Sequence, residues 1–310
     1  MQILVTGGTG FIGAWIVRSL LAAGHKVRIF DIKDDSRLVR ALAGEAAAEI
    51  DWRMGDIRDG EAVHAAAEGC DTIVHLAAIL TPACREQPVL GAEVIVIGTL
   101  NVFEAARRHG IAKVVYASSA GVFGPEDGAR PLPITHYGAF KLATEGSARA
   151  YWHDYGIASV GFRPFVVYGP GRELGLTAGP SLAAEAAATG EAYEFIYTGQ
   201  SDLLYVEDLA AAFEAAVARD IAGAHAFNLV GEVATVDEVI AEIRRQVPDA
   251  RLSAAGPSLP TAPELASDTT LPSVLGALPR TGLAEGLART IAFYRKAAPA
   301  VGRSTEQAKG

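Results

Sequence analysis

The stretch that decides the fold is Gln2-Ile3-Leu4-Val5-Thr6-Gly7-Gly8-Thr9-Gly10-Phe11-Ile12-Gly13, at the start of a chain of 310 residues. Residues 2–6 are short, apolar and β-branched, as a buried parallel strand is. Gly7, Gly10 and Gly13 follow at regular spacing, and a helix is expected over 10–23. Glycine allows positive φ and a close backbone approach to a phosphate. Because the start of a helix attracts anions, the stretch predicts a dinucleotide pyrophosphate site; the alternative is a glycine turn without a ligand.

The second expected strand, residues 26–30, ends at Asp31, which follows Gly13 by 18 residues. A separation of about 20 residues is the one at which a carboxylate meets the adenosine ribose of a bound dinucleotide. A carboxylate there accepts both ribose hydroxyls and repels a 2′-phosphate, so we expect NAD rather than NADP. Lys33 works slightly against this preference, because a nearby cation tolerates the phosphate.

Short apolar strands alternate with helices through the first half of the chain. Strands are expected at 50–54, 71–76, 112–118 and 157–162, and long helices at about 88–108 and 137–155. Buried strands separated by helices imply a parallel sheet with helices on both faces. The predicted fold class is therefore α/β, a doubly wound parallel sheet.

The pattern changes after Pro164, where Gly169-Pro170-Gly171 breaks the alternation. We therefore expect two units. A nucleotide-binding domain takes residues 1–168 and about 207–230, and a smaller C-terminal substrate lobe takes about 169–206 and 231–298. In the lobe, Thr235 with Glu238 predicts the start of a helix and 256–279 predicts a loop, while 299–310 predict a flexible tail.

Composition narrows the class of protein. Half of the residues are apolar, the net charge is −9 and the pI is about 5.3, whereas nucleic-acid binding requires a basic surface. The apolar stretches are short and interrupted, so we expect no membrane span. Cys70 and Cys84 are too few for a disulfide framework or a zinc site. We expect a cytoplasmic protein that binds a small molecule, and neither nucleic acid nor a metal.

Tyr137 and Lys141 form a Tyr-x-x-x-Lys pair on the expected helix 137–155. They lie one turn apart and share a face. An ammonium beside a phenol favours the phenolate and lowers the phenol pKa from about 10, which makes tyrosine a base near neutral pH. Ser119 follows the fifth expected strand, where the ligand crevice of a doubly wound sheet lies. The three side chains predict removal of a hydroxyl proton while hydride leaves the same carbon for a nicotinamide.

With these motifs, the chain resembles the extended short-chain dehydrogenase/reductases of the NAD-dependent epimerase/dehydratase type over roughly residues 2–230. The resemblance rests on Thr6–Gly13 (TGGTGFIG), Gly55–Asp59 (GDIRD), His75–Ala78 (HLAA), Gly98–Val102 (GTLNV), Ser118-Ser119, Tyr137–Lys141, Arg163-Pro164, Val167–Gly171 (VYGPG) and Tyr205–Ala210 (YVEDLA). It implies a Rossmann fold, NAD as the cofactor and a homodimer with a four-helix interface. The candidates for that interface are the helices at about 88–108 and 137–155, of which the first is more apolar than packing on a sheet requires.

The resemblance also implies roles for individual residues. The catalytic ones are Ser119, which also contacts the substrate, Tyr137 as the base and Lys141 as its partner on the nicotinamide ribose. The remaining cofactor-binding residues are Gly7, Gly10, Phe11, Ile12 and Gly13 around the pyrophosphate, Asp31 at the ribose, Asp56 and Ile57 at the adenine, Leu76, Ala77 and Ala78 along the phosphates and ribose, and Phe165.

Departures from the family pattern narrow the reaction. Ala120 and Gly121 replace the acidic pair of the dehydratases, which argues against elimination of water. Val166 and Ser201 stand where nucleotide-sugar enzymes carry an Asn and an Arg. Ile95 replaces an Asn that usually makes a structural hydrogen bond. Arg172, at the entrance to the substrate lobe, has the geometry to clamp a carboxylate; alternatively, it is a surface residue paired with Glu173 or solvent.

Three functions remain open at this level. The first is an NAD-dependent oxidoreductase that oxidises a secondary hydroxyl of a small sugar, sugar acid or hydroxy acid. The second is a sugar or nucleotide-sugar epimerase, which oxidises and re-reduces one carbon. The third is a dinucleotide-sensing regulator without catalysis, against which the intact Ser119, Tyr137 and Lys141 argue. Fold alone does not decide among them.

Overall fold

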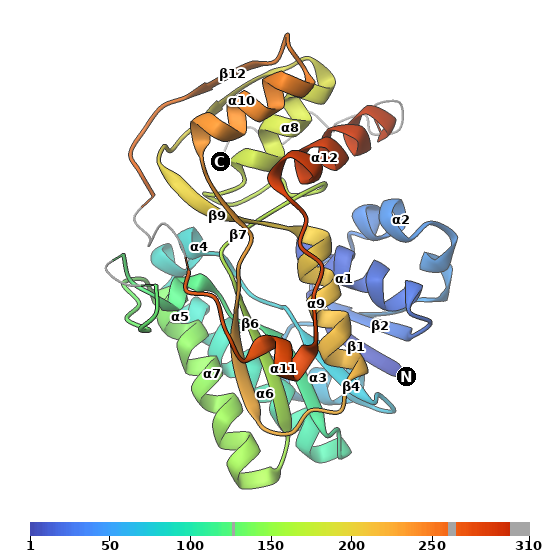
Figure 1. Ribbon diagram of the computed structural model, residues 1–310. Coiled ribbons are helices and arrows are strands. Elements are labelled where there is room, and N and C mark those ends of the chain that lie inside the picture. Colours follow the sequence, from blue (N-terminus) through green and yellow to red (C-terminus); the bar gives the residue numbers. More distant parts are fainter. Residues whose placement is uncertain (126–127, 260–264, 298–310) are drawn as a thin grey trace.

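The computed structural model of the chain describes residues 1–125, 128–259 and 265–297. A seven-stranded sheet has the order β10-β6-β5-β4-β1-β2-β3, with every neighbouring pair parallel (Figure 1). Strand order reverses between β1 and β4, as in a doubly wound sheet, so the predicted fold class is confirmed. The strands are β1 Gln2–Thr6, β2 Lys26–Asp31, β3 Asp51–Met54, β4 Thr72–His75, β5 Lys113–Ala117, β6 Ala158–Pro164 and β10 Ala224–Leu229.

Helices cover both faces of this sheet because its strands are apolar on both sides. Along β1, Ile3 and Val5 pack into one buried cluster and Leu4 into another, as the two-residue period of a strand requires. On the first face α1 packs against α2 and α9, and on the second α6 packs against α3 and α7. These helices are α1 Phe11–Ala22, α2 Arg37–Ala43, α3 Gly60–Ala67, α6 Gly98–His109, α7 His136–Tyr155 and α9 Val206–Ala218.

The long apolar helix expected at 88–108 is present but not uniform. It consists of α5 Pro88–Ala92, a π-helical turn Glu93–Ile97 and α6. The Ile95 side chain cannot make the hydrogen bond of the Asn that it replaces. Instead, Thr99 Oγ1 donates to the Ile95 carbonyl oxygen at 2.5 Å. Pro88–His109 is long and apolar enough to cross a membrane, although we expected no such stretch from the sequence. It packs against α3 and α7, and a core helix passes the same test.

A smaller set of elements lies above the carboxyl ends of the main strands in Figure 1. β7 Val166–Tyr168, β9 Gln200–Tyr205 and β11 Glu232–Thr235 form one sheet, and β8 Ala192–Phe195 pairs with β12 Arg251–Ala254. The helices are α8 Gly179–Thr189, α10 Val236–Gln246 and α12 Leu283–Ala297. Thr235 and Glu238 form the capping box that the sequence predicted at the start of α10.

The stretch 256–279 is not only a loop of the substrate lobe, as we expected. It contains α11 Leu271–Leu275, which packs against α9 beside the main sheet. Asn228 at the end of β10 donates to the Ala266 carbonyl oxygen at 2.9 Å, so this segment crosses back to the nucleotide-binding half of the chain. The flexible tail predicted at 299–310 lies outside the described residues.

Candidate active site

The glycine turn between β1 and α1 has no room for side chains. Gly7 has a φ of +71°, and a Cβ added there would lie 2.7 Å from the Ala77 nitrogen. At Gly13 an added Cβ would lie 2.3 Å from the Gly7 carbonyl oxygen. Gly10, the N-cap of α1, contributes no capping side chain, so the first N–H groups of the helix are left for a ligand. Phe11 and Ile12 form the first turn and pack against the core, and this cradle fits a pyrophosphate.

Asp31 ends β2 and faces the glycine turn. Its Oδ2 accepts hydrogen bonds from the Thr9 backbone nitrogen at 3.1 Å and from Thr9 Oγ1 at 2.7 Å. Its Oδ1 accepts one from the Lys33 backbone nitrogen at 3.1 Å. A carboxylate has about four acceptor positions, so Asp31 retains a place for one ribose hydroxyl, rather than two, unless Thr9 turns away.

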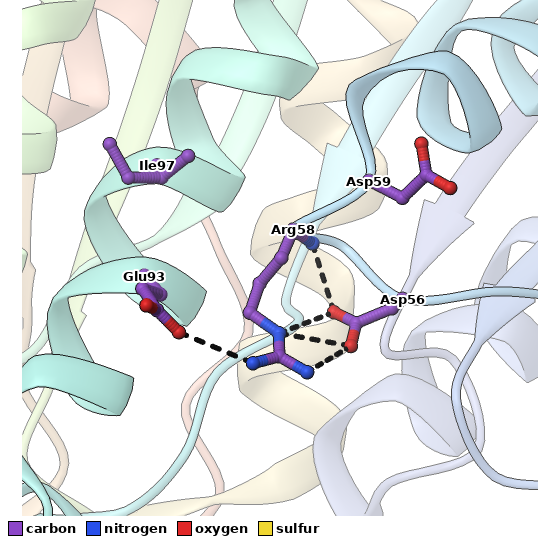
Figure 2. A pocket seen from close by; sticks show the side chains of 5 residues that line it. All are labelled: Asp56, Arg58, Asp59, Glu93 and Ile97. Carbon is purple, nitrogen blue, oxygen red and sulfur yellow. Dashed lines mark hydrogen bonds and ion pairs between the residues drawn. The ribbon is translucent and has the colours of Figure 1, made fainter.

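Asp56 lies beyond β3 at a pocket of about 490 Å³ (Figure 2), and Ile57 beside it is buried in the core. Figure 2 shows the Arg58 guanidinium directed at the Asp56 carboxylate, with a further contact to Glu93 across the pocket. Arg58 Nη2 lies 2.6 Å from Asp56 Oδ2, and Arg58 Nη1 lies 3.2 Å from Glu93 Oε2. These contacts hold the pKa of Asp56 below its usual value. The side chain proposed for adenine is therefore already engaged by Arg58, and the backbone of this segment is left for the base.

The segment after β4 runs beside the glycine turn. The Leu76 backbone nitrogen donates to the Thr6 carbonyl oxygen at 3.0 Å, and Ala77 packs on Gly7; Ala78 follows on the exposed side. His75, the last residue of β4, is buried between Thr6 and Thr99. Its Nδ1 lies 2.7 Å from Thr6 Oγ1 and its Nε2 3.1 Å from Thr99 Oγ1. Burial and the nearby Lys141 cation lower the pKa of His75 to about 3, so this histidine is neutral and structural.

Ser119, Tyr137 and Lys141 meet at the carboxyl end of β5, as the sequence predicted. Ser119 Oγ accepts a hydrogen bond from the Gly121 backbone nitrogen at 3.0 Å and is also hydrogen-bonded to the Tyr137 phenol. Lys141 is 4 % exposed, and its Nζ lies 5.8 Å from the centre of the Tyr137 ring. The arrangement brings a hydroxyl, a phenol and an ammonium to one end of the sheet.

The protonation of these groups differs from the expectation that Lys141 lowers the pKa of Tyr137. The Lys141 ammonium donates to the Ala117 carbonyl oxygen at 2.7 Å. Burial raises the pKa of Tyr137, opposed by the hydrogen bond from Ser119 and the charge of Arg172. Burial also lowers the pKa of Lys141 to about 8. The phenol is therefore protonated at neutral pH in this structure, and the lysine is close to losing its charge.

Glu145 and Arg163 form a buried ion pair behind the catalytic side chains, which the sequence analysis missed. Arg163 Nη2 lies 2.5 Å from Glu145 Oε2, and Ser118 Oγ donates to Glu145 Oε1 at 2.5 Å. Glu145 lies one turn after Lys141 on α7. The sequence signals only half of this contact, because Glu145 follows Lys141 by four residues on one helix whereas Arg163 comes from β6.

Arg172 lies at the mouth of the substrate lobe and does not pair with Glu173. Its Nη2 donates to Thr177 Oγ1 at 2.7 Å and its Nη1 to the Val167 carbonyl oxygen. In the part of the chain that the structure describes, no carboxylate lies within 4.0 Å of this guanidinium. Its charge acts on both Tyr137 and Tyr197.

Two positions that distinguish nucleotide-sugar enzymes are closed to a ligand. Val166 on β7 is 2 % exposed and Ser201 on β9 is 4 % exposed, so neither offers a charged group to the crevice. Phe165 is half-buried and packs between two core clusters at the end of β6. Within the described ranges no group of three or more potential metal ligands comes together.

A doubly wound sheet with a glycine cradle at one switch point and a Ser-Tyr-Lys cluster beside it defines a dinucleotide-dependent oxidoreductase class. The sequence model of the NAD dependent epimerase/dehydratase family matches residues 3–230, and the chain belongs to this family. It is therefore an NAD-dependent enzyme of the extended short-chain dehydrogenase/reductase type, and the expected cofactor is confirmed.

Known relatives include both epimerases and dehydrogenases. The chain is 32% identical to a UDP-glucose 4-epimerase of Mycolicibacterium smegmatis, over 95% of this chain and 99% of that protein. It is 31% identical to a uronate dehydrogenase of Pseudomonas syringae pv. tomato, over 52% of this chain and 58% of that one. The crystal structure of Thermus thermophilus UDP-glucose 4-epimerase in complex with NAD superimposes with a TM-score of 0.82 at 31% identity, over 96% of this chain and 100% of that one.

Proposed function

We propose that the protein is an NAD-dependent dehydrogenase that oxidises a secondary hydroxyl of a small sugar, sugar acid or hydroxy acid. The observation that carries this proposal is the meeting of Ser119, Tyr137 and Lys141 at the carboxyl end of β5. NAD supplies the hydride acceptor when bound. Ser119 orients the substrate hydroxyl by a hydrogen bond, and Tyr137 takes its proton. Lys141 contacts the nicotinamide ribose, and the hydrogen bond from Ser119 and the charge of Arg172 favour the Tyr137 phenolate.

The cofactor is held by the residues named from the sequence. The cradle of Gly7, Gly10 and Gly13 receives the pyrophosphate, and Asp31 accepts a ribose hydroxyl. Backbone groups of Asp56 and Ile57 meet the adenine, because the Asp56 side chain is occupied by Arg58. Phe11, Ile12, Leu76, Ala77, Ala78 and Phe165 complete the walls. Support comes from the glycine geometry, because a Cβ at Gly7 or Gly13 would collide with the backbone of the turn and open its tight shape.

A nucleotide-sugar epimerase is the second candidate, favoured by full-length similarity to UDP-glucose 4-epimerases. The reaction would use the same Tyr137 and Lys141, and the product would be re-reduced before release. Against this candidate, Val166 and Ser201 are buried and uncharged, so two anchors for the nucleotide diphosphate are lacking. We therefore place net oxidation first.

We also propose a cytoplasmic homodimer with a four-helix interface built from the helical stretch 88–109 and α7. Val89 and Ile97 are 72% and 46% exposed on the first stretch, and Trp152 and Tyr155 are 37% and 56% exposed on α7. Exposed apolar and aromatic side chains on two adjacent helices are typical of protein interfaces. The smaller lobe, about 169–206 and 231–298, would supply the substrate contacts, Arg172 among them.

The deciding experiment offers sugars, sugar acids and hydroxy acids with NAD and follows both NADH absorbance and product structure. Net NADH that disappears in Tyr137→Phe supports the dehydrogenase. An isomerised sugar without net NADH supports the epimerase instead. NAD binding with neither outcome across the panel would contradict both.

A further inference from the structure

We propose that Arg172 and Tyr197 form the recognition site for a carboxylate, so that the substrate is a small hydroxy acid or sugar acid. This inference rests on the proposed oxidation at Tyr137 and narrows its substrate class. Arg172 is a cation without an acidic partner among the described residues. Its guanidinium is only partly exposed, and a partly desolvated charge is stabilised when an anion or water completes its hydrogen bonds.

Tyr197 provides an independent sign of a missing partner. Its side chain is 3 % exposed, and its hydroxyl is one of the few buried polar atoms of the described chain without a hydrogen bond. Buried hydroxyls are nearly always hydrogen-bonded, so each exception calls for a ligand, a water or an ion. The hydroxyl lies 3.1 Å from the place of a Cβ on Gly179, two residues after the Thr177 that binds Arg172.

Arg172 and Tyr197 meet the same short stretch of chain at the start of α8. Arg172 Nη2 donates to Thr177 Oγ1, and the Tyr197 hydroxyl lies beside Gly179, two residues further on. The charge of Arg172 also acts on the Tyr137 phenol, against the burial that raises the pKa of Tyr137. The ligand would therefore place its carboxylate at Arg172 and its secondary alcohol at Tyr137.

The loop that carries Arg172 is fixed from outside the site. Trp15 Nε1 donates to the Pro170 carbonyl oxygen at 2.9 Å, and the Gly171 backbone nitrogen donates to the Tyr294 hydroxyl at 2.8 Å. Gly171 has a φ of +88° and lies against Leu38, where a larger residue would not fit. The guanidinium is thus preorganised, and it keeps N–H groups beyond the two it spends on Val167 and Thr177 for a carboxylate fork.

A nucleotide diphosphate is the competing anion, and the charge balance argues against it. Ser201 and Val166 leave Arg172 without a second cation from β7 or β9. One guanidinium matches one carboxylate in charge and in its paired hydrogen bonds. The proposal therefore commits to a monocarboxylate.

The test measures kcat/KM for hydroxy acids and sugar acids, each paired with its primary amide or parent neutral sugar. We expect the wild-type protein to prefer the acid by at least about 30-fold, the lower end for a buried charge pair. Arg172→Gln should bring that ratio close to one. Arg172→Lys should retain only part of the preference, because lysine lacks the paired N–H groups of the guanidinium. Tyr197→Phe should lower it about tenfold.

Two controls separate this site from general damage. Arg244→Gln removes an arginine of the same lobe whose hydrogen bonds go to the Ala250 and Leu252 carbonyl oxygens, and Tyr193→Phe removes a phenol on β8. Both should keep the wild-type ratio. As a readout without turnover, acetate should raise the melting temperature of the NAD-loaded protein more than acetamide does, and Arg172→Gln should remove that difference.

The outcomes separate the inference from the function beneath it. Net NADH with an acid-to-amide ratio near one would overturn the carboxylate site and leave the dehydrogenase standing. Stronger binding of a UDP-sugar that depends on Arg172 would overturn it in favour of a diphosphate. Carboxylate binding that depends on Arg172, without oxidation of any substrate, would support the site and contradict the dehydrogenase.

Discussion

Gly138→Ala is the sharpest test of how the active site is assembled, because a single methyl group is placed at its tightest contact. A Cβ at this position would lie 1.9 Å from the Gly121 carbonyl oxygen and 3.0 Å from Pro133 Cβ. Ordinary van der Waals contacts begin at 3.4 Å. Because packed atoms cannot overlap, the first turn of α7 would have to move away from the 119–122 segment by roughly 1.5 Å. Tyr137 would move with it, away from Ser119.

The expected effect is larger on turnover than on stability. A misplacement of about 1 Å can cost about 10²-fold in rate, and we expect at least that loss in kcat with NAD affinity nearly unchanged. Overpacking costs about 1–3 kcal/mol, offset by the gain of up to about 1 kcal/mol when alanine replaces a helical glycine. Urea unfolding should therefore show a loss of about 0–2 kcal/mol.

Gly146→Ala in the same helix is the matched control. Nothing lies within 4 Å of a Cβ added at Gly146, so this variant should gain about 0.5–1 kcal/mol and keep full turnover. Sedimentation velocity on both variants checks that they share the wild-type assembly. Equal turnover in Gly138→Ala and Gly146→Ala would show that the contact between α7 and the serine loop does not position the catalytic phenol.

Three further predictions follow from single groups. Tyr137→Phe should lower hydride transfer by about 10²–10⁴ with little change in NAD affinity; near-normal single-turnover rates would exclude Tyr137 as the base. Asp31 should make NAD bind at least about tenfold more tightly than NADP, and equal affinities by titration would contradict that role. Because burial lowers the pKa of Lys141 to about 8, against about 10.4 in an unfolded chain, the unfolded state binds more protons between these values. The free energy of unfolding should therefore rise with pH across that window, and Lys141→Met should flatten the rise in thermal unfolding measured from pH 7 to 10.

The parts of the site that the sequence predicted are those encoded by local spacing. The glycine turn, Asp31 at the end of β2 and the Tyr-x-x-x-Lys pair each lie within one or two adjoining elements, so their geometry follows from strand and helix periods. The ion pair of Glu145 with Arg163 joins α7 to β6, and no spacing rule links them. Arg172 was a candidate from the sequence, whereas Tyr197, which we propose as its neighbour in the carboxylate site, had no signal of its own.

A short-range contact also escaped prediction, because the Asp56 carboxylate has two possible partners. Arg58 stands two residues after Asp56 and takes the carboxylate that the family pattern assigns to adenine. The small sheet pairs β7, β9 and β11, which are strands of three to six residues separated by long insertions, and no spacing rule predicts that pairing. Burial, which sets the pKa values of Tyr137 and Lys141, is a property of the packed molecule and has no direct counterpart in the sequence.

Ser119, which we propose as the catalytic serine, owes its position to a match between one strand end and one helix face. Residues 137, 141 and 145 of α7 lie on successive turns of the same face. They meet three successive residues at the end of β5, of which Ala117 is the last residue of the strand. Tyr137 is hydrogen-bonded to Ser119, Lys141 to the Ala117 carbonyl oxygen and Glu145 to Ser118. Three contacts of different chemistry fix the strand end against the helix, and Ser119 cannot slide along α7 without breaking the other two. The Tyr-x-x-x-Lys motif is thus part of a longer Tyr-Lys-Glu register, whose last member holds the strand end through Ser118 and is itself paired with Arg163.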